Sequence, residues 1–346
     1  MNKDEKIRLL IVDDSFLTRK ILIELLKDDP EIDIVGEAID GEDAFLKTKI
    51  LRPDVITMDY NMPLVNGLEA IKKIKAAMDI FPAILMVSGN TMEGATETLE
   101  CLKHGAIDFI PKPSGELSLD IKKIQRELIN KIKIAAKVKK TDYKEIERKE
   151  KIKKDSKISV VVIGASTGGP PVIEEIISSL AKDIKAPILV VQHMPEHFTA
   201  SLANRLDGLS ELSVVEASEG EELLPGKCII ARGGKHMLLN KMVDGRVVIH
   251  LDDKPLRNGF RPSIDYTMES VAKLYGKKTM GIVLTGMGRD GSDGMVEIEN
   301  ESGYTITQLP EEAVVDSMPR SAWDTGVIDE SLGVKDIIKK IKELCF

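Results

Sequence analysis

Short apolar runs alternate with stretches of helical periodicity through the first 130 residues of the chain. The runs read IRLLIV, IDIV, DVITM, AILMV and AIDFI, and a helix expected over residues 16–27 carries Leu17, Ile21, Leu22 and Leu25 on one face. Five strand–helix units predict a flavodoxin-like (βα)5 fold, with helices on both faces of a parallel sheet. Because the crossovers are right-handed, every loop that follows a strand is expected at one carboxyl edge.

The same alternation returns in the second half of the chain, over residues 158–346. Its apolar runs read ISVVVIG, APILVVQ, KCIIA, RVVIHL, TMGIVLTG and YTITQ. The terminal stretch GVKDIIKKIKELCF has the apolar spacing of a helix that faces a core. This half is therefore predicted to be a second α/β domain, a Rossmann-like, doubly wound and mostly parallel sheet.

A charged segment separates the two patterns. Residues 131–157 hold 12 basic and five acidic residues and no glycine or proline. So few apolar side chains cannot offset the entropy of ordering, which predicts an exposed linker. A basic arm for nucleic acid is the alternative, disfavoured by the interspersed acids and acidic flanks. The predicted divisions are residues 1–134, a linker over 135–157, and residues 158–346.

Composition narrows the class of protein further. The net charge of −8 argues against nucleic acid as a partner, and no apolar run reaches the roughly 18 residues of a membrane span, so no membrane insertion is expected. Cys101, Cys228 and Cys345 are odd in number and widely spaced, which is typical of reduced cysteines in a cytoplasmic protein. A catalytic cysteine remains the weaker alternative.

Polar residues gather at the strand ends of the first domain. Asp13 and Asp14 end the first strand, Asp59 the third and Ser88 the fourth, and Lys112 follows the fifth. Three converging carboxylates repel one another unless a cation lies between them, and hard oxygen ligands suit Mg²⁺. Any one aspartate could instead cap the helix that follows it. The whole set at one edge favours a magnesium site beside a carboxylate that accepts a phosphoryl group.

The stretches LLIVDDS, VITMDYNMP, MVSGNT and GAIDFIPKP resemble the receiver domains of two-component response regulators, over about residues 6–130. The resemblance implies that Asp59 accepts the phosphoryl group and that Asp13, Asp14 and Asp59 hold Mg²⁺. It also implies that Ser88 and Lys112 contact the phosphoryl group. The phosphodonor that this resemblance implies is a histidine kinase.

A glycine-rich turn, VVVIGASTGGPP at 160–171, opens the second domain. A Walker loop would need a lysine that is absent, and a Rossmann fingerprint would need glycine where Ser166 stands. The stretch does fit a strand, a G-x-S-x-G turn and a helix in succession, with Gly164, Ser166 and Gly168 at the motif positions. Such a turn exposes a serine hydroxyl beside backbone N–H groups. A plain helix cap is the alternative for this motif taken alone.

Partners for a serine nucleophile lie at neighbouring strand ends. His193 ends the strand of the next βαβ unit, and parallel neighbours lie roughly 5 Å apart, so the two side chains can meet. The loop MGRDGSDGM offers Asp290 or Asp293 to orient the imidazole. A lone histidine would more often be a structural hydrogen-bonding group. Oxyanion donors are expected among the backbone N–H groups of Thr167 and Gly168 or of a second loop, at Met287 and Gly288.

The second half, over residues 158–330, resembles the catalytic domain of chemotaxis protein-glutamate methylesterases. The stretches that carry the likeness are GASTGGP, VVQHMPEHFTASLANRLD, FRPSIDYTMESVA and GIVLTGMGRDGSDGM. The resemblance implies Ser166 as nucleophile, His193 as base and Asp290 as the orienting carboxylate. It implies hydrolysis, without a cofactor, of γ-glutamyl methyl esters on methyl-accepting chemotaxis receptors, deamidation of receptor glutamines, and activation by phosphorylation. A phosphorylation-gated DNA-binding regulator and a non-catalytic scaffold are the rival interpretations.

Overall fold

The computed structural model describes residues 6–78, 80–89, 91–112, 120–138 and 157–346. The chain divides into two compact units, Met1–Asp142 and Tyr143–Phe346, and each is described by itself. Within the described ranges, no helix is both long and apolar enough to cross a membrane. Most of the predicted linker, residues 139–156, lies outside the described residues.

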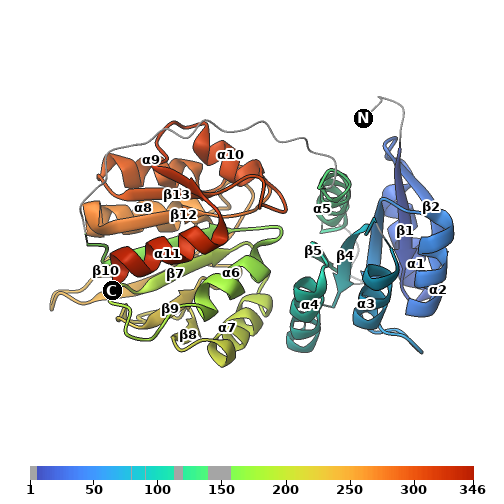
Figure 1. Cartoon of the computed structure of the whole chain (residues 1–346), viewed down its shortest axis with the longest axis horizontal. Coiled ribbons are helices and arrows are strands. Elements are labelled where there is room, and N and C mark those ends of the chain that lie inside the picture. Colours follow the sequence, from blue (N-terminus) through green and yellow to red (C-terminus); the bar gives the residue numbers. More distant parts are fainter. Residues whose placement is uncertain (1–5, 79, 90, 113–119, 139–156) are drawn as a thin grey trace. The chain divides into compact units, whose positions relative to one another are not determined.

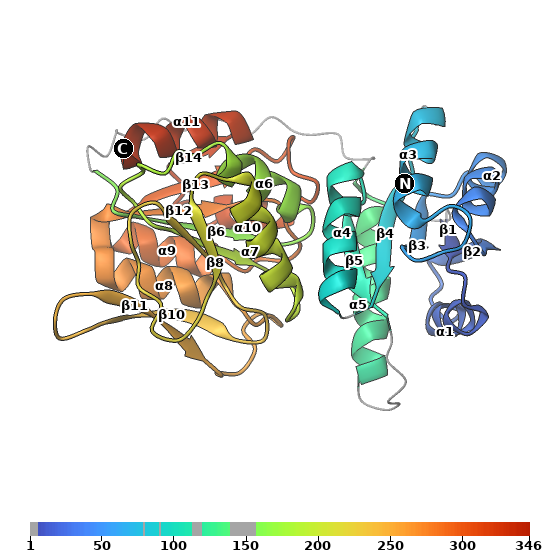
Figure 2. The same cartoon turned by 90° about the horizontal axis from the view of Figure 1, so that it is seen from below.

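The first unit is a five-stranded parallel sheet in the order β2-β1-β3-β4-β5. Its strands are β1 (Ile7–Val12), β2 (Ile32–Ala38), β3 (Val55–Asp59), β4 (Ala83–Ser88) and β5 (Asp108–Pro111). Its helices are α1 (Phe16–Leu26), α2 (Gly41–Leu51), α3 (Gly67–Ala77), α4 (Met92–His104) and α5 (Asp120–Ala135). Helices α1 and α5 pack together on one face, and α2, α3 and α4 form a row on the other (Figures 1 and 2). The flavodoxin-like prediction is confirmed.

Local chemistry sets the helix boundaries in this unit. Ser15, Asp40, Asn66 and Thr91 each accept a hydrogen bond from a backbone N–H of the first turn, so they cap α1 to α4. The apolar face expected for α1 was wrong at Leu17, which is 68% exposed. The buried face centres on Leu22 instead, and at 100° per residue Leu17 lies on the far side of the helix.

The second unit contains a seven-stranded sheet in the order β14-β13-β12-β6-β7-β9-β8, with every pairing parallel. Its strands are β6 (Val160–Ala165), β7 (Ile188–Gln192), β8 (Ser213–Glu216), β9 (Lys227–Ile230), β12 (Thr279–Val283), β13 (Tyr304–Gln308) and β14 (Glu330–Leu332). The predicted strand RVVIHL forms outside this sheet. It is β11 (Val247–Asp252), which pairs antiparallel with β10 (His236–Lys241).

Helices cover both faces of this sheet. They are α6 (Gly169–Ser178), α7 (Phe198–Leu209), α8 (Ile264–Tyr275), α9 (Ser292–Asn300), α10 (Ser317–Trp323) and α11 (Val334–Cys345), with a short 3₁₀ turn at Gly276–Lys278. Helices α6, α7 and α11 lie on one face; α8, α9 and the β10–β11 pair lie on the other (Figures 1 and 2). Strand β6 lies in the middle, buried along its whole length, so the loop that follows it has a rigid base.

Candidate functional site

Ser166 lies at the point where the strand order of the second unit reverses. Strand β6 pairs with β7 on one side and β12 on the other, and crevices form at such switch points. The turn after β6 leads directly into α6, and Gly168 adopts φ +78°, which favours glycine. The loop after β12 comes close: a Cβ on Gly286 would lie 2.8 Å from the Cβ of Ser166. Both predicted loops therefore flank the serine.

His193 follows β7 and forms the central polar contact of the site. Its Nε2 atom lies 2.8 Å from Oδ2 of Asp290, and its backbone N–H donates to the carbonyl of Ala165. The Nδ1 atom is buried and has no hydrogen-bond partner in the described part of the chain. With a carboxylate on Nε2, the proton belongs on Nε2 and the lone pair on Nδ1. This nitrogen is available to take a proton.

Asp290 is fully buried and surrounded by donors. Oδ2 also accepts from the backbone N–H of Ile264 at 2.8 Å, and Oδ1 accepts from the Ser263 hydroxyl at 3.0 Å. Burial by itself would raise the pKa of this carboxyl, but the hydrogen bond from His193, the positive charge of the imidazole when it is protonated, and the N–H of Ile264 outweigh it, so the pKa of Asp290 is lowered. Asp290 therefore stays ionised beside the imidazole.

Asp293, the alternative carboxylate of the same loop, lies elsewhere. Its oxygens face Arg289 at 2.8 Å and Arg257 at 3.4 Å, and it lies in the first turn of α9. Among the predicted oxyanion donors, the N–H of Gly288 already donates to the hydroxyl of Ser317 at 3.1 Å. In the described residues no hydrogen bond joins Ser166 to the imidazole of His193. The structure thus brings His193 to Asp290 rather than to Asp293.

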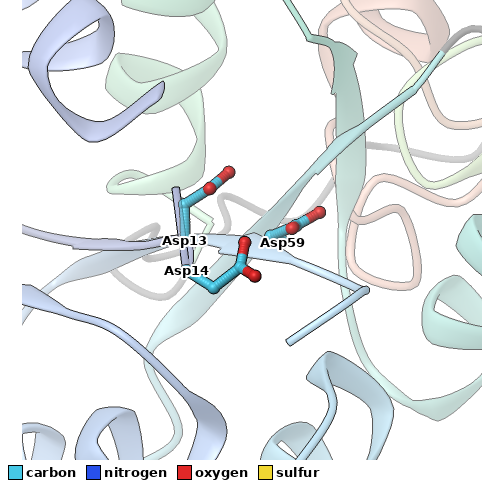
Figure 3. Close-up of side chains that lie close together, drawn as sticks. All are labelled: Asp13, Asp14 and Asp59. Atoms are coloured by element: carbon cyan, nitrogen blue, oxygen red, sulfur yellow. The ribbon is translucent and has the colours of Figure 1, made fainter. Parts of the chain in front are cut away.

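A second polar cluster lies at the carboxyl edge of the first unit. Oxygen atoms of Asp13, Asp14 and Asp59 lie within 4.8 Å of one another (Figure 3). Asp13 and Asp59 are buried and Asp14 is exposed, so the group opens toward solvent on one side. The Lys112 ammonium lies 2.8 Å from Asp59 and 3.0 Å from Asp13. One cation against three carboxylates leaves the cluster with a net negative charge.

The electrostatics of this aspartate cluster fit a divalent cation. Burial raises the pKa of Asp59, the nearby Asp13 charge adds to this, and Lys112 opposes it only in part. Hard oxygen donors with an open side are the set that Mg²⁺ prefers. The Ser88 hydroxyl points away, donating to the carbonyl of Gly94 at 3.1 Å, so contact with a phosphoryl group on Asp59 would require a rotamer change.

Three residues around His193 and Asp290 have no role in the sequence prediction. Phe260 stacks on His193 with ring centroids 3.7 Å apart and planes 7° apart. The Asn258 amide donates to Asp290 and to Asp265, and Asp265 is fully buried. The Asn-Gly dipeptide at 258–259 is a turn signal in the sequence, but nothing local shows what the turn contacts.

Comparisons with known proteins identify two family domains in the chain. A family model described as "Response regulator receiver domain" matches residues 9–123, and one described as "CheB methylesterase" matches residues 161–341. The fold and the matches define a response regulator whose second unit is a hydrolase. The chain belongs to the CheB methylesterase family.

Relatives match along nearly the whole chain. Proteins named protein-glutamate methylesterase/protein-glutamine glutaminase are 42% identical in Pyrococcus horikoshii, over 94% of this chain and 89% of that one, and 43% identical in Thermotoga maritima, over 99% of both. The crystal structure of the Thermotoga maritima CheB methylesterase catalytic domain is 44% identical. It covers 54% of this chain and 98% of its own, with a TM-score of 0.53.

Proposed function

We propose that this protein removes methyl groups from γ-glutamyl methyl esters of methyl-accepting chemotaxis receptors, releasing methanol, and deamidates receptor glutamines. The observation that carries the proposal is the buried Nδ1 atom of His193, which is unpartnered among the described residues while Asp290 holds Nε2. That is the state a general base needs before it meets a serine hydroxyl. The names of the relatives supply the class of substrate.

The reaction is acyl transfer through Ser166. Its Oγ attacks the ester carbonyl while Nδ1 of His193 takes the hydroxyl proton, and the same proton then passes to the departing methoxide. Water attacks the glutamyl-serine ester by the reverse route, which leaves glutamate on the receptor and regenerates the serine. A glutamine follows the same path with ammonia as the leaving group. The charged imidazolium forms beside ionised Asp290, whose lowered pKa keeps its charge in place.

The oxyanion of the tetrahedral intermediate needs backbone donors beside Ser166. The candidates are the N–H groups of Thr167, Gly168, Met287 and Gly288, on the two loops that flank the serine. Gly288 would first have to release the Ser317 hydroxyl, which favours Met287 on that loop. Removal of one such donor typically lowers the rate about 10²–10³-fold.

The receiver unit is proposed to switch the esterase by phosphorylation in the cytoplasm, with a chemotaxis histidine kinase as phosphodonor. Asp59 is the acceptor, and Asp13, Asp14 and Asp59 are the residues that would hold Mg²⁺. When bound, the metal ion neutralises phosphoryl oxygens and lowers the repulsion at the acceptor. Lys112 contacts Asp59 before transfer and would pair with the phosphoryl group after it, and Ser88 would turn from Gly94 to donate to the same group.

One assay tests the proposal as a whole. Purified protein is mixed with membranes that carry radiolabelled methylated receptors, and volatile methanol is collected. The phosphorylated wild type should release methanol, and Ser166→Ala should not. Equal release by both proteins would refute the serine mechanism, and no release by either would favour a scaffold that only binds receptors.

A further inference from the structure

A tight turn between β11 and α8 contacts two of the proposed catalytic side chains, those of His193 and Asp290. The turn consists of residues 257–260, Arg-Asn-Gly-Phe, and its ends pair through Arg257 N to Phe260 O at 3.2 Å and Phe260 N to Arg257 O at 2.9 Å. Asn258 has φ +53° and Gly259 φ +88°. Two central residues in the left-handed region with Asn-Gly define a type I′ turn, which is a rigid two-residue connection. The turn therefore holds its side chains in set directions.

Phe260, at the end of this turn, packs against the imidazole of His193. Its ring lies 3.7 Å from the ring of His193, nearly parallel at 7°, and Phe260 itself is half-buried. The His193 side chain is only 4% exposed. A stacked ring of this kind limits rotation of the imidazole about its Cβ–Cγ bond and keeps water from one face of the hydrogen bond to Asp290. Rotation of the imidazole would break the hydrogen bond between its Nε2 atom and Asp290.

Asn258 acts on the other partner. Its amide nitrogen donates to Oδ1 of Asp290 at 3.3 Å and to Oδ2 of Asp265 at 2.8 Å. Asp265 in turn accepts the N–H groups of Gly291 and Gly294 at 2.8 Å, which fixes the start of α9 directly after Asp290. Burial raises the pKa of Asp265, and the charge of Asp290 raises it further. A donor shared by two buried carboxylates relieves this repulsion.

Arg257 anchors the turn to the body of the unit. Its guanidinium lies 2.7 Å from Glu269 on α8 and 3.4 Å from Asp293 on α9, and it lies over the ring of Tyr266 at 4.8 Å. These contacts come from the two helices that flank Asp290. The turn is thus attached to the same framework as the carboxylate that it contacts.

We propose that the turn 257–260 is a positioning element of the esterase, in which Phe260 sets the imidazole plane and Asn258 holds the carboxylate of Asp290. The inference deepens the proposed function and depends on His193 as the base. Neither residue acts on substrate; both act through His193 and Asp290. Loss of either contact should lower kcat and leave KM nearly unchanged.

The test uses the phosphorylated full-length protein and methanol release from methylated receptors. Phe260→Leu keeps an apolar side chain and removes the flat ring, so kcat should fall about threefold to tenfold. Phe260→Tyr keeps the ring and should restore kcat to within about twofold of the wild type. Phe45→Leu replaces another half-buried phenylalanine, in the receiver unit, and is the matched control, which should leave esterase activity unchanged.

Asn258→Gly gives a second, independent variant. Glycine accepts φ +53° without strain, so the turn should remain while the amide is lost, and kcat should fall about tenfold or more. The spectroscopic readout is the low-field proton NMR signal of the His193–Asp290 hydrogen bond, identified by its absence in His193→Ala. Both Phe260→Leu and Asn258→Gly should shift or broaden this signal, whereas Phe260→Tyr should retain it.

The outcomes separate this inference from the proposed function. If Ser166→Ala is inactive but both turn variants keep wild-type kcat and the wild-type signal, the positioning role is refuted and the serine mechanism stands. A rise in KM at unchanged kcat would also refute it, because Phe260 or Asn258 would then bind substrate. If Ser166→Ala retains full activity, the proposed function itself fails.

Discussion

The two polar clusters of this protein, around Asp59 and around Asp290, occupy the same topological position but differ in their electrostatics. Both lie at the carboxyl edge of a parallel sheet where the strand order reverses, and both depend on a buried aspartate. Asp59 has a raised pKa and Asp290 a lowered one. Asp59 has acidic neighbours and one lysine, whereas Asp290 receives hydrogen bonds from a histidine, a hydroxyl and backbone N–H groups. The topology places both carboxylates at the carboxyl edge of a sheet. The hydrogen-bond donors and charges around each carboxylate decide its pKa and hence its chemistry.

The largest effect on activity is expected from substitutions at His193 and Asp290. His193→Ala and Asp290→Asn should each lower methanol release by about 10³–10⁴-fold, because the base loses either its nitrogen or its orienting carboxylate. A protein with both changes should be scarcely slower than the worse single variant, since the residues act as one unit. Asp293→Asn is the control on the same loop. If Asp293→Asn were inactive and Asp290→Asn nearly normal, the carboxylate would have been assigned to the wrong residue.

Phosphorylation at the aspartate cluster of the first unit should depend on a divalent cation and on Asp59. Asp59→Asn should abolish incorporation of labelled phosphate from a small phosphodonor, because an acyl phosphate needs a carboxylate nucleophile. Chelation of divalent ions should also abolish incorporation by the wild type. Asp14→Asn should lower incorporation to a level between those of the wild type and Asp59→Asn. Stable labelling of the Asp59→Asn protein would place the acceptor elsewhere.

Communication between the units should have a smaller effect. A fragment that begins at Lys157 contains every described residue of the second unit, and the isolated catalytic domain of the Thermotoga maritima relative has been crystallised. If the unphosphorylated receiver restrains the esterase, the fragment should be faster than the unphosphorylated full chain by about 5–150-fold, the range of typical allosteric coupling, and should ignore phosphodonor. A folded fragment that is slower would mean that the receiver assists catalysis.

The smallest effect concerns stability and contrasts the two aspartates directly. Asp59→Asn should raise the Tm of the first unit, because it removes a charge that the folded state disfavours. Asp290→Asn should lower the Tm of the second unit, since charge-assisted hydrogen bonds worth about 1.5–3 kcal/mol each are weakened. Calorimetry of the full chain, with each transition assigned from single-unit fragments, measures both. Shifts of the same sign would contradict the proposed contrast.

The pH dependence sharpens the same comparison. A carboxyl whose pKa is raised in the folded state destabilises the fold once the pH exceeds its unfolded pKa of about 3.9. The gain in Tm from Asp59→Asn should therefore shrink as the pH falls through the folded pKa of Asp59. Asp290 has a lowered pKa, so its stabilisation is present above about pH 3.9 and is lost only as pH falls further, through its folded pKa. The deficit of Asp290→Asn should therefore persist across the range in which the Asp59 effect disappears.

Sequence reasoning was accurate where burial repeats along the chain. The five apolar runs of the first unit became β1 to β5, and the terminal helix α11 buries Val334, Ile337 and Ile341 as its spacing predicts. It was less accurate where the pattern is short or where an element lies outside the main sheet. The strand at Val247–Asp252 was recognised but belongs to an antiparallel pair, and the edge strand β14 spans only three residues and was not anticipated.

The sequence by itself determined the two α/β units and the polar residues that follow their strands. Strands and helices bury one face with different periods, so the apolar spacing identifies each element locally. Right-handed crossovers then place the residues that follow parallel strands at one edge of the sheet. Only the tertiary structure decided that His193 meets Asp290 and not Asp293, and that Phe260 and Asn258 reach both partners from a distant turn. These contacts join segments up to 97 residues apart, and their distances depend on how α8 and α9 pack on the sheet. No local pattern of apolar and polar residues encodes that packing.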